Sequence, residues 1–133
     1  MKIGMLTGLW YIADQRSLID SLRQVAASGF HYVDLHGVFH GGPAHLDSKT
    51  RQAVKIELAA LGLKPRNYVL HALHNPAAAN GAAHAQNLAY LKEGIDLAVS
   101  WGVNQIMLNA GQWVYGVPRQ LAWQRSVIFL REV

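Results

Sequence analysis

The sequence predicts an α/β fold in which parallel strands alternate with helices. One unit recurs three times: a helical pattern closed by a glycine, followed by a short apolar run that ends in a polar residue. Glycine closes helices because it enters the left-handed backbone region without a Cβ penalty. Right-handed crossovers assemble such units into a parallel sheet with helices outside. We therefore expect four parallel strands in sequential order, near residues 2–7, 31–36, 67–71 and 104–109.

Composition favours a single folded domain spanning residues 1–133. A content of 51% hydrophobic residues suffices for a modest core, and no apolar run approaches the roughly 18 residues of a membrane span. The absence of cysteine rules out disulfides and thiolate metal sites. The formal net charge is +4, but no two of the twelve Lys and Arg residues are adjacent, so nucleic-acid binding is not favoured. We expect a cytoplasmic protein without membrane contact.

Local signals predict the first strand and the first long helix. Lys2–Leu6 is a short apolar run that ends at Thr7, so we expect a strand whose tip lies in a loop. Ser17, with Asp20 three residues later, resembles a capping box. Apolar residues then recur at helical spacing, which predicts a helix from about Ser17 to Ser28.

The second strand shows period-two alternation and carries two polar candidates. Alternation sets Asp34 and His36 on one face, with Val33 and Leu35 on the other. If the first face lines the inside of a barrel, Asp34 and His36 lie one above the other near its rim. The alternative is that Asp34 only fixes its own or a neighbouring strand, and the sequence leaves both open. The loop Gly37–His45 that follows is long and rich in Gly and His, which suits contact with a ligand.

The rest of the chain repeats the same unit. Asp47 or Ser48 can cap the next helix. The third strand ends in His71 and the fourth in Asn109, each after an apolar run. Pro118 fits the first turn of a last helix.

The strand tips supply the candidate site, because parallel α/β folds bind ligands at the carboxyl ends of their strands. The other histidines, His74 among them, are better interpreted as solvated or capping residues. A metal site needs three or four ligands, usually including carboxylates, and Asp34 is the only strand-borne carboxylate. We therefore assign no metal ligand and no catalytic group. The candidates for substrate binding are Thr7, Asp34, His36, His71 and Asn109.

Four segments form a recognisable succession: Lys2–Met5, Ala27–Leu35, a strand ending in His71, and Met107–Gly111. Together they resemble the N-terminal half of the xylose-isomerase-like TIM barrels. That superfamily contains sugar isomerases, ketose epimerases, hydroxypyruvate isomerases, inosose dehydratases and abasic-site endonucleases. Val33-Asp-Leu35 stands where the family often has Val-Glu-Leu, and His71 stands at its strand 3 histidine. Asn109-Ala-Gly111 replaces the family's His-Pro-Gly, which argues against the endonuclease branch.

The resemblance implies parallel (β/α) units of a TIM barrel, of which this chain supplies about four of eight, a half-barrel. In the isomerases and epimerases of the superfamily, Glu, Asp, His and Glu from later strands hold a divalent metal, Mn, Mg or Zn. Those strands lie outside this sequence. The resemblance also implies a small carbohydrate substrate, and either a homo-oligomer or pairing with a complementary half.

Three functions stay open from the sequence. The first is part of a metal-dependent sugar or sugar-phosphate isomerase or epimerase, which abstracts a proton next to a carbonyl; the 133-residue chain alone is then expected to be inactive. The second is a metal nuclease that acts at abasic sites in DNA. The third is a non-catalytic half-barrel that must pair with another chain, because open sheet edges and half-covered apolar faces disfavour a monomer.

Overall fold

The computed structural model describes residues 3–133. The chain separates into two compact units. The first unit comprises Met1–Leu70 and Gly94–Met107, and the second comprises His71–Glu93 and Leu108–Val133. Each unit is described by itself below.

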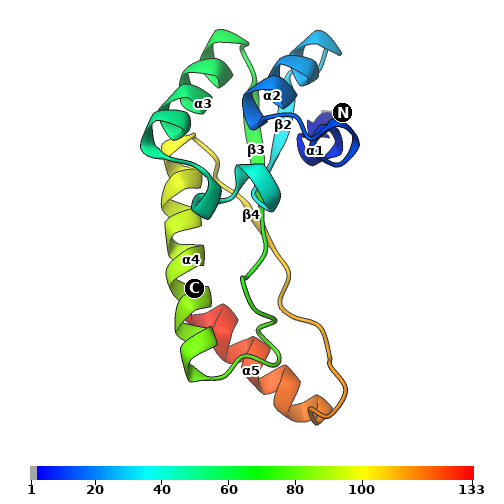
Figure 1. Cartoon of the computed structure of the whole chain (residues 1–133), viewed down its shortest axis with the longest axis vertical. Helices are drawn as coiled ribbons and strands as arrows, with labels where there is room; N and C mark the ends of the chain where they lie inside the picture. Colours follow the sequence, from blue (N-terminus) through cyan, green and yellow to red (C-terminus); the bar gives the residue numbers. More distant parts are fainter. Residues whose placement is uncertain (1–2) are drawn as a thin grey trace. The chain divides into compact units, whose positions relative to one another are not determined.

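The secondary structure alternates strands and helices along the chain, which Figure 1 colours from the N-terminus to the C-terminus. The four strands form one parallel sheet in the order β1-β2-β3-β4. This order confirms the predicted α/β fold with sequential parallel strands. The elements are β1 (Gly4–Leu6), α1 (Gly8–Asp14), α2 (Leu18–Ala27), β2 (Tyr32–His36), α3 (Ser48–Ala60), β3 (Lys64–Leu70), α4 (Gly81–Ser100), β4 (Ile106–Leu108) and α5 (Arg119–Glu132).

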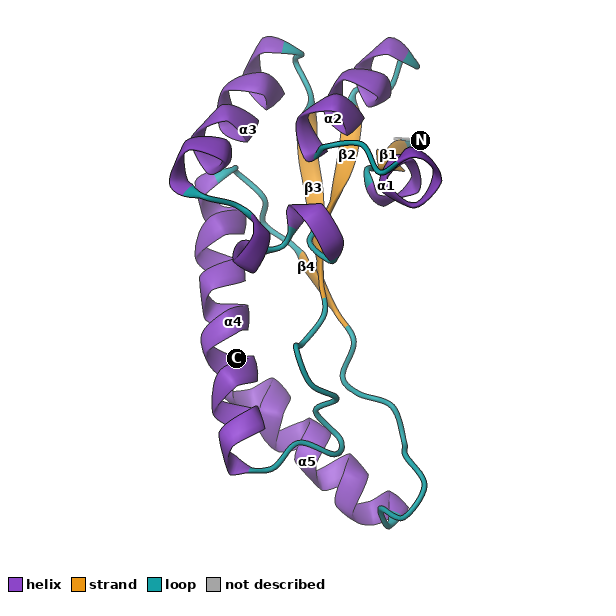
Figure 2. Cartoon of the chain, in the orientation of Figure 1, coloured by secondary structure: helices purple, strands orange, loops and turns teal. Residues whose placement is uncertain are grey.

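The third strand begins earlier than the sequence indicates, at Lys64 instead of Asn67. Lysine and proline are disfavoured in strands, yet the backbone N–H of Lys64 donates to the carbonyl of His31 at 2.9 Å. Pairing with β2 therefore outweighs local preference, with a register irregularity in β2 between Val33 and Asp34. The side-by-side arrangement of β2 and β3 is visible in Figure 2.

The segment after Thr7 is a helix, α1, where the sequence predicts a loop. This expectation was wrong: Gly8–Asp14 forms a helix, in which the side chains of Leu9 and Ile12 are exposed. Gly8 at its start lies against the imidazole of His36, and a Cβ there would come within 2.7 Å of His36 Cγ. A helix of 7 residues spans about two turns, which is too short for a clear periodic signal in the sequence.

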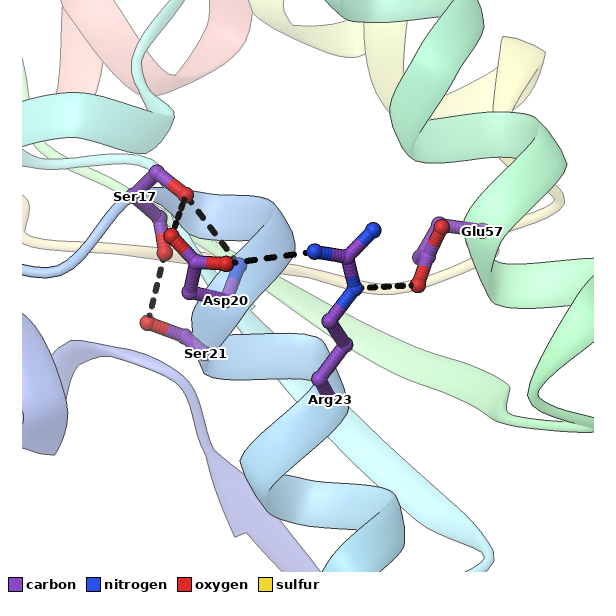
Figure 3. A network of polar contacts seen from close by, with 5 residues as sticks. All are labelled: Ser17, Asp20, Ser21, Arg23 and Glu57. Carbon is purple, nitrogen blue, oxygen red and sulfur yellow. Dashed lines mark hydrogen bonds and ion pairs between the residues drawn. The ribbon is translucent and has the colours of Figure 1, made fainter.

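Helix α2 has Ser17 as its N-cap, and the Ser17 and Asp20 pair that the sequence singles out lies at this helix start (Figure 3). The N–H of Asp20 donates to Ser17 Oγ at 3.1 Å, and Ser17 Oγ donates to a carboxylate oxygen of Asp20 at 2.7 Å. A cap of this kind stabilises a helix by about 1 kcal/mol. Arg23 Nε donates to Glu57 Oε1 at 2.8 Å and so joins α2 to α3, although an exposed ion pair stabilises a fold only slightly.

The core of the first unit lies on one face of β2. Val33 and Leu35 are fully buried, while Tyr32, Asp34 and His36 are half-buried in alternation with them. This alternation confirms the predicted two-faced strand. The helices contribute the apolar side chains Leu18, Leu22 and Val25 from α2 and Val54 and Leu58 from α3.

Two aromatic residues extend this core. Tyr68 in β3 is fully buried, and its hydroxyl donates to the carbonyl of Gly41 at 2.6 Å. Its ring meets that of Trp101 edge to face, with centroids 5.6 Å apart, and the indole N–H of Trp101 donates to the carbonyl of Arg51 at 3.0 Å. These contacts satisfy both polar groups, as burial of Tyr and Trp requires.

The second unit contains the first part of α4 and the whole of α5. Phe129 of α5 is fully buried, and its ring centroid lies 6.0 Å from that of His84 in α4. His84 Nε2 also lies 2.6 Å from Glu132 Oε2. An apolar and a polar contact therefore hold the two helices together at one place.

No helix in the described part of the chain, residues 3–133, is both long and apolar enough to cross a membrane.

Candidate functional site

The predicted site residues fall into two groups. Thr7, Asp34 and His36 belong to the first unit, and His71 and Asn109 belong to the second. Each group has its own geometry.

Thr7 and His36 fix the carboxyl ends of β1 and β2 to each other. The side chain of Thr7 is fully buried, and its hydroxyl oxygen accepts the backbone N–H of His36 at 2.9 Å. The backbone N–H of Thr7 donates to the carbonyl of Asp34 at 3.0 Å. The observed contacts of Thr7 are therefore structural, and direct contact between Thr7 and a substrate stays a prediction.

Asp34 lies on the sheet face opposite the buried Val33 and Leu35. It lines an open cavity of about 240 Å³. The cavity lining contains this carboxylate, a guanidinium and two carboxamides, so this face of the sheet carries polar side chains. The lining residues are Gly4, Tyr32, Asp34, Arg66, Asn67 and Gln105.

His71 and Asn109 line the same cavity in the second unit. Each directly follows a strand, His71 after β3 and Asn109 after β4, so both occupy the carboxyl-terminal positions that the sequence analysis singled out. The cavity measures about 140 Å³. Its lining residues are His71, Ala72, His74, Asn75, Pro76, Asn109, Gly111 and Gln112.

Asn109 is oriented by its own loop. Its Oδ1 accepts the backbone N–H of Gly111 at 3.0 Å, an arrangement typical of Asn in turns. The amide nitrogen of such a side chain is a hydrogen-bond donor. Asn109 can therefore offer a donor at a fixed place at the end of β4.

His74 is the cavity residue that the sequence analysis treated as solvated. Its backbone N–H donates to Asn87 Oδ1 at 2.8 Å and its carbonyl accepts from Asn87 Nδ2 at 2.9 Å. Its ring Nε2 lies 2.8 Å from Gln86 Oε1; because this oxygen only accepts, Nε2 is the donor in that contact. Asn87 is fully buried in α4, and nothing in the sequence indicates its partner in this loop.

The cavity is lined by hydrogen-bonding and small apolar side chains. They are imidazoles, carboxamides and small apolar groups, and no Lys, Arg, Asp or Glu belongs to the described lining. Imidazoles and carboxamides both donate and accept hydrogen bonds. The cavity is thus suited to an uncharged ligand with several hydroxyl groups, and it offers no cation for a phosphate backbone.

The donor set does not fit a divalent metal. Within residues 3–133, no group of three or more His, Asp or Glu side chains lies close enough to hold a metal ion. His71 and His74 share a cavity whose described lining contains no carboxylate, whereas Mn²⁺ and Mg²⁺ prefer oxygen ligands and Zn²⁺ sites need three or four ligands.

No protein-family model and no curated protein matches the sequence. Solved structures match its fold. A D-psicose 3-epimerase, in a crystal structure obtained in the presence of D-fructose, aligns with a TM-score of 0.76 and 14% identity over 98% of this chain and 46% of that chain. A D-tagatose 3-epimerase-like protein aligns with a TM-score of 0.76 and 15% identity over 99% and 47% of the two chains.

A probable 3-DHS dehydratase from Bacillus anthracis aligns with a TM-score of 0.69 and 18% identity over 99% of this chain and 49% of that chain. All three are TIM barrels of the xylose-isomerase-like superfamily. The predicted half-barrel fold and the resemblance on which it rests are therefore confirmed at the level of fold. The chain spans 46% to 49% of the length of the solved structures that it matches.

Proposed function

We propose that this chain contributes a substrate-binding part of a sugar isomerase or epimerase built as a TIM barrel. The observation that carries the proposal is a hydrogen-bonding cavity directly after β3 and β4, whose described lining contains no Lys, Arg, Asp or Glu, on a fold shared with a D-psicose 3-epimerase over 98% of the chain. Ligands of parallel α/β barrels bind at the carboxyl ends of the strands. The cavity and the fold therefore support the same kind of ligand.

The proposed reaction is abstraction of a proton next to a carbonyl, as in an isomerase or epimerase. In this proposal His71 and Asn109 hydrogen-bond the hydroxyls of the sugar, and Asp34, His36 and Thr7 contribute from the ends of β1 and β2. A neutral imidazole donates from one nitrogen and accepts at the other, which matches two adjacent hydroxyls. The proton-transferring base is proposed to come from (β/α) units beyond this chain.

A divalent metal, Mn, Mg or Zn, is proposed for the complete barrel, where it would polarise the substrate oxygens. Because the residues of this chain do not fit such an ion, its ligands are proposed to come from other strands. His71 and Asn109 then act on the sugar and not on the metal.

The proposed partner is the other part of the barrel, either as a further segment or as a separate chain, with a homo-oligomer as an alternative. In the described sheet β1 and β4 are the edge strands, and Ile106 and Met107 in β4 are 37% and 55% exposed. An exposed apolar edge strand is a template for pairing with another strand.

We further propose that residues 1–133 form a single domain equivalent to the N-terminal half of the barrel. Its proposed location is the cytoplasm.

The two other functions are less well supported. A nuclease needs cations for the phosphate backbone, and the described lining of the cavity after β3 and β4 contains none. A non-catalytic half-barrel would share the fold and the open edges, and it differs from the proposal only in failing to bind a sugar.

Titration of the ¹⁵N-labelled chain with D-fructose tests the proposal. We expect chemical-shift changes at His71, Asn109 and their neighbours, and loss of these changes in His71→Ala and Asn109→Ala. Asn104→Ala is the control, because Asn104 is exposed and lies outside the cavity lining. Uniform or absent shift changes at millimolar D-fructose would favour the non-catalytic half-barrel.

A further inference from the structure

The cavity after β3 and β4 is built from two loops that are separate in sequence. One loop, His71–Asn80, follows β3, and the other, Asn109–Pro118, follows β4. Two such loops keep a fixed position relative to each other only if a specific contact joins them, because surface loops are more mobile than the strands from which they extend. In the second unit Asn75 makes that contact.

The side chain of Asn75 pairs with both backbone groups of Gln112. Its Nδ2 donates to the carbonyl of Gln112 at 2.6 Å, and its Oδ1 accepts the N–H of Gln112 at 2.9 Å. The two partners fix the orientation of the amide, since an N–H requires the oxygen and a carbonyl requires the nitrogen. Asn75 Oδ1 also accepts the N–H of Ala77 at 3.2 Å within its own loop.

The backbone of Asn75 is held as firmly as its side chain. Its carbonyl accepts the N–H groups of Ala78 and Ala79 at 3.0 and 2.9 Å. A side chain on a fixed backbone loses little further entropy when it forms two hydrogen bonds. Asn75 is therefore a preorganised anchor for the second loop.

Gly111 permits the close approach of the two loops. Its backbone φ is +116°, a region that side chains rarely adopt. A Cβ at this position would lie 2.9 Å from Asn75 Oδ1 and 2.8 Å from the backbone nitrogen of Ala77. The glycine and the asparagine thus form one complementary contact, between loops that carry His71 and Asn109.

We infer that Asn75 is the positioning residue of this site: by tying Gln112 to the β3 loop, it sets the distance between His71 and Asn109 that a ligand meets. The identity of the ligand rests on the proposed function, whereas the hydrogen-bonded contact between the two loops does not depend on it. Other side chains do not replace it. Aspartate keeps the acceptor and loses the donor, leucine has a similar size and lacks both, and glutamine adds one methylene to the reach.

Amide hydrogen exchange of the 133-residue chain, followed by NMR, tests the tie directly. In Asn75→Leu the exchange of the Gln112 amide should accelerate at least about tenfold, the scale of one lost hydrogen bond. The amide of Tyr68, which donates to the carbonyl of Gln105 at 2.9 Å in the first unit, should keep its rate. Asn75→Asp should give an intermediate rate at Gln112, and it remains informative if the leucine variant folds poorly.

Ligand binding separates positioning from mere structural support. With D-fructose as the probe, Asn75→Leu should weaken the response of His71 and Asn109 at least tenfold while the melting temperature stays within a few degrees of the wild-type value. Asn104→Leu, at an exposed position outside the cavity, is the matched control. Unchanged exchange at Gln112, or unchanged D-fructose affinity despite faster exchange, would overturn the inference.

Failure of the proposed function gives a different result. If the wild-type chain does not respond to D-fructose, the proposed function fails for this chain, and the role of Asn75 is tested without a ligand. If Asn75 positions His71 and Asn109, Asn75→Leu should shift the resonances of both residues in the free chain. Unchanged resonances would refute the role of Asn75.

Discussion

His71 and His74 lie on the same cavity, but the protein holds them by different means. His74 is fixed through its backbone by the fully buried Asn87 and through its ring by Gln86. His71 directly follows β3 and is exposed. His74 is therefore the more firmly positioned ring, whereas the position of His71 is set by the end of β3.

Replacing His71 by alanine should lower kcat/KM at least about tenfold in a complete barrel that contains this chain. One hydrogen bond to a substrate hydroxyl is worth roughly 1.4 kcal/mol, which corresponds to that factor. Steady-state kinetics on a ketohexose measures the effect, and His31→Ala, an exposed histidine at the opposite end of a strand, serves as the control. A lower melting temperature with unchanged turnover would show that His71 is structural.

His40 should make the stability of the chain depend on pH. Burial, followed by the positive charges of His36 and His45, lowers the pKa of His40 below the 6.5 of an unperturbed histidine. The unfolded chain then binds more protons than the folded chain. The contribution of His40 to the free energy of unfolding is therefore fully present above about pH 6.5, and it falls as the pH decreases toward the folded pKa. Urea denaturation at pH 7.5 and pH 5.5 measures this effect. Between these two pH values, the free energy of unfolding should decrease less in His40→Gln than in wild type. An equal loss in both would contradict the assignment.

At the level of helices and strands, the sequence predicts the features whose signal is local. The N-cap at Ser17, the alternation along β2 and the glycines that follow α2, α3 and α4 all depend on neighbouring residues. Each therefore appears in the sequence as a short pattern. The predicted sheet order followed from the same repeated unit.

The sequence does not predict features that a distant partner decides. Lys64 becomes a strand residue because the carbonyl of His31 accepts its N–H. In the candidate site, Asn75 and Asn87 act on backbone groups 37 and 13 residues away. An asparagine carries no sign of such a partner, whereas the positions of His71 and Asn109 at strand ends could be predicted.

The N-cap of α3 gives an element-scale prediction. Asp47 Oδ1 accepts the N–H of Thr50 at 2.7 Å, and hydrogen bonds to the side chain and backbone of Thr50 hold the pKa of Asp47 below its usual range. Asp47→Ala should lower the melting temperature, while Asp47→Asn, which keeps an acceptor, should remain close to wild type at pH 7. Because the folded pKa is depressed, the difference between aspartate and alanine should shrink as the pH falls through that value. Equal melting temperatures of the alanine and wild-type chains at pH 7 would rule out this cap.

At the scale of the whole molecule, the chain is four (β/α) units of a barrel type that uses eight. Two compact units divide the described chain, and the proposed site residues are distributed between them. A complete barrel would bring further strands to the open edges of the sheet. We propose that catalysis depends on those strands, and that this chain supplies groups that hydrogen-bond the sugar.

Metal binding gives a whole-molecule prediction. Because the described residues offer no cluster of three ligands, the chain should bind Mn²⁺, Mg²⁺ and Zn²⁺ only weakly. Isothermal titration calorimetry measures this, with His36→Asn and His71→Asn to identify any histidine that contributes. A tight site with one ion per chain would contradict the assignment of the metal ligands to other strands.

A crystal structure of the chain with D-fructose would show whether this half-barrel binds a sugar at the ends of its strands. We expect the sugar to occupy the cavity after β3 and β4, with hydroxyl oxygens within about 3.2 Å of the side chains of His71 and Asn109. D-fructose bound instead only in the cavity beside Asp34 and Arg66, or found nowhere on the chain at saturating concentration, would contradict the claim that this half-barrel carries a carbohydrate site.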